Sequence, residues 1–331
     1  MAMIHDPAHR ISRLLGKGVE EGVYPGAVLL VTKGGQRVLL EAVGNLSVIP
    51  PKAPMRKDTL FDLASLTKPL VTGLAIMALV DEGRLSLEEV LPELIKARVP
   101  ADKRGLTLRS LLCHSAGLAD WKPFYETLVN YELKERKAVL RDLILREPLV
   151  YSPGKGCLYS DLGFMVLEWV IEEASGMQMH QFAGQRFFRP LELERAFLWT
   201  EHNAKRFKKE EFAATEDCPW RKKVLQGEVH DANAYALGGY SGHAGFFGTA
   251  EAVLIIVDLL REHYLGTRSD YFRPETVRQF LARQEGVEGC KRALAWDMPS
   301  AEIHGDVGMD GPRKRRHRRF SHESRPPDPN K

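Results

Sequence analysis

A long apolar helical pattern lies in the first quarter of the chain and has no charged residue between Lys68 and Asp81. The pattern begins at Ser65 and stops at Gly83. Its longest aliphatic run, residues 74–80, is far shorter than the ~20 residues that a membrane helix needs, so no membrane span is predicted. Apolar residues make up 44% of the 331 residues and charged residues 27%, which excludes wholesale disorder and fibrous folds.

The segments on either side of this pattern predict a sheet and further helices. Residues 27–33 and 37–43 are rich in strand formers and are separated by Gly34-Gly35, a two-residue hairpin signal. Apolar residues at helical spacing predict helices near residues 7–22, 86–97, 107–113, 134–146, 161–175 and 250–262.

This order of elements indicates an α/β (α+β) fold, an antiparallel sheet flanked by helices with an inserted, mostly helical region. We expect residues 1–75 and 235–298 to form the sheet region and residues 76–234 the helical region. The length also allows two domains of ordinary size.

The C-terminal segment differs in composition from the rest. Residues 311–331 hold eight Lys or Arg and two acidic residues, which leaves 39 basic and 42 acidic residues in positions 1–310. The body is therefore mildly acidic and is not expected to bind nucleic acid. Residues 299–331 lack apolar periodicity, so a disordered basic tail is predicted there. Binding of nucleic acid or anionic lipid by the tail is the less favoured alternative.

The four cysteines are widely spaced and form no C-x-x-C. This pattern favours reduced thiols in a cytoplasm over a disulfide framework or a zinc site. The N-terminal residues show no apolar core followed by small residues, so no secretory signal is predicted. We therefore expect a cytoplasmic location.

The strongest chemical signal is Ser65-Leu66-Thr67-Lys68 at the start of the long helix. A serine hydroxyl is a poor nucleophile unless a base removes its proton, and three residues along a helix place Lys68 on the face of Ser65. The positive end of the helix favours a developing oxyanion. Taken alone, the pattern is weak evidence, and a capping serine beside an exposed lysine is the favoured interpretation.

Five segments in order resemble the class C β-lactamase and penicillin-binding-protein-like serine hydrolases, over about residues 20–298. The S-x-x-K element is a known feature of penicillin-recognising enzymes. The similar segments are Tyr24-Pro-Gly-Ala-Val, 55–70 around Ser65, Leu79-Val-Asp-Glu-Gly-Arg-Leu-Ser-Leu, 106–118 with Cys-His-Ser-Ala-Gly-Leu, and Pro153-Gly-Lys-Gly-Cys-Leu-Tyr-Ser-Asp.

The resemblance implies further site residues. Tyr159 matches the catalytic tyrosine of the family's Y-x-N, and Lys68 and Tyr159 would share the proton of Ser65. Asp161 replaces the usual Asn, and a carboxylate cannot donate a hydrogen bond to a substrate amide. We assign Asp161, together with His243 and Gly245, to substrate binding.

The family's third element, K-T-G or H-x-G on a strand, has two candidate positions. His243-Ala-Gly245 satisfies H-x-G, although residues 227–248 resemble a family stretch that precedes the true third element. That element should follow Arg292-Ala-Leu-Ala-Trp-Asp297, but neither K-T-G nor H-T-G occurs there. We interpret the abrupt change of composition as a shifted reading frame or a truncation.

Other arrangements are weaker. His230, Asp231 and His243 fit no compact zinc spacing, and hydrogen bonds that fix a loop are favoured over metal ligation. An α/β-hydrolase using Ser241 or Ser115 lacks a complete G-x-S-x-G. Cys113 beside His114 is interpreted as a buried structural thiol, because adjacent helical residues point apart.

The sequence thus predicts a serine hydrolase that forms an acyl-Ser65 intermediate on esters, β-lactams or D-amino-acid peptides. No metal or organic cofactor, nucleic acid or membrane is expected as a partner, and the oligomeric state stays open. A catalytically impaired family member that acts as a binding domain is the main alternative.

Overall fold

The computed structural model describes residues 7–285, 287 and 290–298. The described residues form one compact unit. The predicted disordered tail, residues 299–331, lies outside the described residues. The predicted division of the body at residues 75 and 235 stays a prediction.

The N-terminal hairpin forms as the two glycines predict. Strands β1 (Gly26–Lys33) and β2 (Gln36–Gly44) pair antiparallel, with Lys33 opposite Gln36. Gly34 and Gly35 form the two-residue loop with φ of 59° and 81°, the left-handed region that such turns require.

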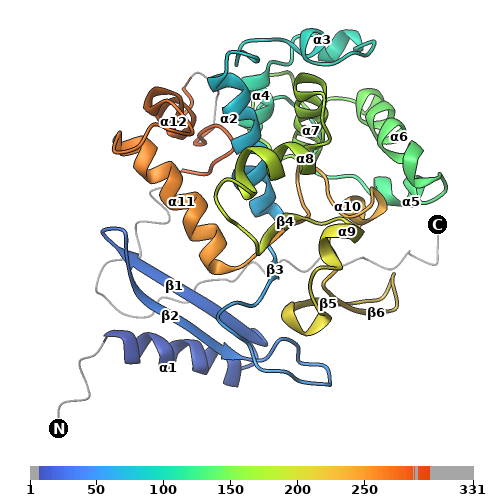
Figure 1. Cartoon of the computed structure of the whole chain (residues 1–331). Helices are drawn as coiled ribbons and strands as arrows, with labels where there is room; N and C mark the ends of the chain where they lie inside the picture. The colour runs from blue at the N-terminus through green and yellow to red at the C-terminus, as the bar shows by residue number, and fades with distance from the viewer. Residues whose placement is uncertain (1–6, 286, 288–289, 299–331) are drawn as a thin grey trace. The chain divides into compact units, whose positions relative to one another are not determined.

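Helices cover this hairpin on two sides. Helix α1 (Pro7–Glu20) contacts β2, and α11 (Ala250–Leu265) contacts β1 (Figure 1). Within the described part of the chain the hairpin has no third strand. The helix predicted near residues 250–262 is confirmed as α11, and Thr249 caps its start.

A second antiparallel sheet lies in the middle of the body. Its order is β3 (Phe61–Asp62), β7 (Phe246–Gly248) and β4 (Ala196–Leu198). Strands of two or three residues are too short to show alternation, so no sequence pattern predicts them. This sheet pairs Phe61 with Gly248 and Asp62 with Phe247, so the residues before Ser65 lie next to β7.

The helical pattern from Ser65 forms one continuous run. It consists of a short turn (Ala64–Leu66), a wider π-type segment (Lys68–Gly73) and helix α2 (Leu74–Asp81). The wide segment contains Pro69, which lacks a backbone N–H, and such segments are frequent at functional sites. Length and composition alone would let residues 64–81 cross a membrane, but 67% of this stretch is buried within the body, as in a core helix.

The other predicted helices agree with the structure in all but one case. Helix α4 is Leu108–Leu112, α6 is Leu133–Arg146 and α7 is Asp161–Ser175. The predicted helix 86–97 is wrong except for one turn, α3 (Leu91–Leu94), because Val90 pairs with Thr107 as an isolated bridge. Shorter elements are α5 (Phe124–Leu128), α8 (Met179–Ala183), α9 (Glu201–Ala204), α10 (Ala232–Ala236), α12 (Pro274–Leu281), β5 (Ala214–Cys218) and β6 (Lys223–Gln226).

Candidate active site

Ser65 lies exposed at the surface in a turn that the backbone of Phe246 holds on both sides. Leu63 N–H donates to the Phe246 carbonyl (2.8 Å), and Phe246 N–H donates to Thr67 Oγ1 (3.0 Å). Between them Ala64 adopts φ +46°, a conformation that costs a non-glycine residue on the order of 1 kcal/mol. The turn therefore depends on tertiary contacts.

Asp62 supports the same turn from below. One carboxylate oxygen accepts from Ala64 N–H (2.9 Å) and the other from His230 N–H (2.7 Å). Burial raises the pKa of Asp62, although both hydrogen bonds oppose this shift. The sequence analysis did not identify Asp62 as a site residue. Its position three residues before Ser65 was the feature that could have indicated this role.

Lys68 lies directly beneath Ser65, as the S-x-x-K spacing predicts. Its Nζ donates to Ser65 Oγ (3.0 Å) and to the carbonyl of His243 (3.2 Å). The Lys68 side chain is almost completely buried, which excludes the alternative of an exposed lysine beside a capping serine. An exposed hydroxyl above a buried amine is the arrangement that nucleophilic catalysis by serine requires.

Asp161 completes the surroundings of this amine. Its Oδ1 lies 2.7 Å from Lys68 Nζ. Asp161 is the first residue of α7, and Ser160 caps that helix by accepting from Gly163 N–H (3.1 Å). The carboxylate that replaces the family's asparagine is thus the counter-ion of the Lys68 amine.

Tyr159 contacts Lys68 through its ring. Lys68 Nζ lies 4.7 Å from the ring centroid, and the guanidinium of Arg292 lies 5.2 Å from that centroid. Among the described residues, the Tyr159 hydroxyl has no hydrogen bond to Ser65 or Lys68. Tyr159 is brought to the site, and its role as a proton carrier stays a prediction.

His114 positions the irregular segment that carries Tyr159. Its Nδ1 accepts from Ser160 N–H (2.9 Å), and its ring centroid lies 4.6 Å from that of Tyr159. Burial, together with the positive charges of Arg292 and Lys68, holds the pKa of His114 well below its usual value. The neutral imidazole is therefore a structural acceptor.

Cys113, the neighbour of His114, is buried as predicted. Its Sγ lies 3.1 Å from Ser115 Oγ, and burial raises the pKa of the thiol. Ser115 is likewise buried, which disfavours both residues as nucleophiles.

His243 contacts Lys68 through its carbonyl, and both His243 and Gly245 are buried. The His243 carbonyl accepts from Lys68, while its Nε2 is 2.9 Å from Asp231 Oδ1. Gly245 has φ +104°, and a Cβ there would lie 2.6 Å from the Gly239 carbonyl oxygen. This burial favours a supporting role, and the assignment of both residues to substrate binding stays a prediction.

The three groups Asp161, Asp231 and His243 have ligand-type atoms within 4.8 Å of one another, a spacing that a metal ion could use. The Lys68 ammonium already balances Asp161, and His243 hydrogen-bonds Asp231. Asp231 Oδ1 also accepts from Ala234 N–H (2.7 Å) as the cap of α10. These contacts support the predicted hydrogen bonds that fix a loop.

The Asp231–His243 pair makes stability depend on pH. Burial works against both charges, but the charge and hydrogen bond of His243 lower the pKa of Asp231 to about 2, and Asp231 raises that of His243. The lowered pKa adds stability above about pH 4 that is lost as pH falls towards 2. The raised pKa of His243 adds stability that is fully present below about pH 6.5. This stability is lost as the pH rises through the raised pKa.

The pair therefore stabilises the fold most between about pH 4 and 6.5. Asp231→Asn keeps a helix-capping side chain. We expect its free energy of unfolding to fall less than that of the wild type as the pH rises above about 6.5. Urea unfolding of both proteins at pH 5, 7 and 9 measures this. If the free energy of unfolding changed equally with pH in the two proteins, the result would contradict the ion pair.

Glu168 fixes the loop that carries His243, and sequence reasoning missed it. Its Oε2 accepts from Ser241 Oγ (2.7 Å) and Gly242 N–H (3.0 Å), while its Oε1 lies 2.6 Å from Lys137 Nζ. The feature that could have indicated its role is its position as a single acidic residue within the apolar run of α7. Ser241 is fully buried against this carboxylate, which disfavours it as the nucleophile of an α/β-hydrolase.

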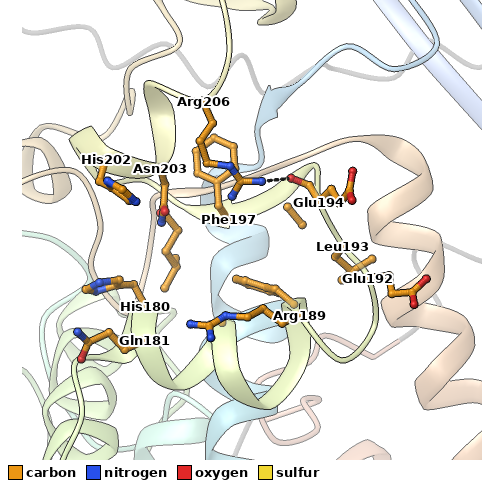
Figure 2. A pocket seen from close by; sticks show the side chains of 14 residues that line it. His180, Gln181, Arg189, Glu192, Leu193, Glu194, Phe197, His202, Asn203 and Arg206 are labelled. Atoms are coloured by element: carbon orange, nitrogen blue, oxygen red, sulfur yellow. Dashed lines mark hydrogen bonds between the residues drawn. The ribbon is translucent and has the colours of Figure 1, made fainter.

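A cavity of about 760 Å³ lies apart from these residues. Figure 2 shows it between α9 and the segment around Arg189, with Arg206 donating to the Glu194 carbonyl (2.9 Å). Its lining includes Phe197 on β4, the strand on the opposite edge of the central sheet from β3. None of the predicted site residues lines it.

The fold and the Ser65–Lys68 site define the class of β-lactamase- and penicillin-binding-protein-like serine hydrolases. The family model described as Beta-lactamase matches residues 11–317. The chain belongs to this family, which confirms the resemblance seen in the sequence.

Known proteins agree with this assignment. An N-acetylmuramyl-L-alanine amidase from Bacillus subtilis (strain 168) is 31% identical over 301 residues, which cover 82% of this chain and 67% of the amidase. The octameric penicillin-binding protein homologue from Pyrococcus abyssi matches with a TM-score of 0.67 at 19% identity, over 84% of this chain and 60% of that chain. EstCE1, a hydrolase with promiscuous acyltransferase activity, matches with a TM-score of 0.63 at 24% identity, over 82% of this chain and 76% of EstCE1. The structural matches confirm the fold class.

Proposed function

We propose that this protein hydrolyses small esters or amides through a covalent acyl-Ser65 intermediate. The observation that carries the proposal is the 3.0 Å contact between the buried Lys68 Nζ and the exposed Ser65 Oγ. The membership of the Beta-lactamase family supports it. The substrate class comprises esters, β-lactams and D-amino-acid peptides, and the amidase name of the Bacillus relative supports the amide members of that class.

In this mechanism Ser65 Oγ attacks the carbonyl carbon while its proton passes to the Lys68 and Tyr159 pair. We assign the backbone N–H of Ser65, in the first helical turn, as an oxyanion donor. The bond to the leaving group then breaks, the leaving group takes up the proton, and water hydrolyses the acyl-Ser65 ester. Lys68 must release a proton before it can accept one, and Asp161 at 2.7 Å is the nearest acceptor.

The carboxylate of Asp161 also bears on which substrates the site would accept. The family's asparagine can donate to a substrate amide, whereas a carboxylate accepts only. This difference favours simple esters over β-lactams. A cytoplasmic location stays a prediction from the sequence.

A fluorophosphonate probe tests the proposal. We expect one probe per chain, located by mass spectrometry on the tryptic peptide that spans residues 58–84 and assigned to Ser65 by fragmentation. Heat-denatured protein is the control, because only a folded site activates the hydroxyl. A folded chain that takes up no probe would instead support the alternative of a binding domain.

A further inference from the structure

Three cysteines that are far apart in the sequence meet beside the Tyr159 segment. The Sγ atoms of Cys157 and Cys290 lie 3.0 Å apart. Both thiols donate to the same carbonyl, that of Cys113, at 3.3 and 3.6 Å. The Cys113 thiol contacts Ser115 Oγ instead (3.1 Å), so Cys157 and Cys290 face each other as a pair.

The two cysteines belong to segments that both contact the site. Cys157 lies two residues before Tyr159, and Arg292, two residues after Cys290, stacks over the Tyr159 ring at 5.2 Å. Three backbone hydrogen bonds join the segment after Cys290 to the rest of the described body. They are Gln284 N–H to the Arg292 carbonyl, Leu294 N–H to the Phe280 carbonyl and Ala295 N–H to the Leu112 carbonyl, at 2.9, 3.0 and 2.9 Å.

We propose that Cys157 and Cys290 are an oxidisable pair, and that a small-molecule disulfide oxidises them to a disulfide bond with each other. This bond links the Tyr159 segment covalently to residues 290–298. Glutathione disulfide serves as the example. The Cys157 thiolate attacks one of its sulfurs, forms a mixed disulfide and releases one glutathione. The Cys290 thiolate then attacks Cys157 Sγ and releases the second glutathione. Two thiols are oxidised, one S–S bond is reduced, and the two protons end on two glutathione thiols.

The environment fixes the order and the speed of these steps. Cys157 is partly exposed and Cys290 is buried, so the oxidant reaches Cys157 first. Burial and the neighbouring Cys290 raise the pKa of Cys157 to about 12, and only the Arg292 charge opposes this shift. Because the thiolate is the reactive form, the pair oxidises slowly at neutral pH.

Peptide mapping of the whole chain tests the proposal. Protein incubated with glutathione disulfide, or with dithiothreitol as the reduced reference, is alkylated and digested with trypsin. We expect the oxidised sample to contain peptides 156–186 and 284–291 joined by a disulfide. A disulfide that closes so long a loop stabilises the native state, so the oxidised protein should melt roughly 5 °C higher.

Substitutions separate this pair from the other two cysteines. Cys157→Ser and Cys290→Ser should each abolish the linked peptides and the rise in melting temperature. Cys218→Ser, in β5, should keep both. A dominant linkage to Cys113 or Cys218, a persistent glutathione adduct on Cys157, or full recovery of alkylated thiols in wild-type protein would overturn the proposal. These readouts do not depend on the hydrolytic activity.

Discussion

Replacing Ser65 with alanine is expected to lower kcat/KM for a p-nitrophenyl ester by about 10⁴- to 10⁶-fold, because the variant lacks the atom that forms the acyl bond. The free energy of unfolding should change by less than about 0.5 kcal/mol, since Ser65 is exposed. Lys68 keeps its contacts with Asp161 and with the His243 carbonyl in this variant. Initial rates, together with urea unfolding, measure both quantities.

Ser86→Ala is the matched control, because Ser86 is also an exposed serine and lies outside the site. It should retain the wild-type rate. Activity that survives Ser65→Ala but is lost in Ser241→Ala or Ser115→Ala would contradict the proposed nucleophile and favour an α/β-hydrolase mechanism.

Replacing Lys137 with methionine is expected to lower the free energy of unfolding by about 3–5 kcal/mol. Lys137 Nζ lies 2.6 Å from both Glu168 and Glu172, and Glu168 is only 4% exposed. Removal of the cation leaves a buried carboxylate without its counter-ion, and this is the physical origin of the loss. Denaturant unfolding monitored by tryptophan fluorescence measures it.

Lys134→Met provides the control on the same helix. Lys134 pairs with Glu132, but both side chains are more than 70% exposed, so this loss should stay below about 1 kcal/mol. The double variant Lys137→Met, Glu168→Leu should be more stable than Lys137→Met alone, because the stranded charge is gone. Equal losses in Lys134→Met and Lys137→Met would show that the buried network contributes nothing beyond a surface pair.

Features coded by adjacent residues could be predicted from the sequence. Gly34-Gly35 predicted the hairpin, because its two-residue loop needs positive φ. Helix α7 could be predicted over its whole length, since Ser160 caps its start and Gly176, with φ 72°, ends it. Helical spacing placed Lys68 on the face of Ser65, and the family resemblance favoured a contact between them over an exposed lysine.

Features made by distant residues could not be predicted. The Glu168 contact with Ser241 joins positions 73 residues apart, and nothing in a single sequence specifies such a pairing. The Lys68–Asp161 ion pair likewise depends on how α7 packs against the helical run from Ser65. The resemblance indicated which residues belong to the site, but only the structure shows that the carboxylate contacts the amine.

The turn at Ser65 has a consequence for the order of events during synthesis. An isolated peptide would avoid the φ of Ala64, so the turn needs the backbone of Phe246, 179 residues after Thr67. A nascent chain that has left the ribosome only as far as α7 therefore carries the serine and the lysine without the partner that sets the turn. Chemical reactivity at Ser65 thus arises only after Phe246 has emerged from the ribosome.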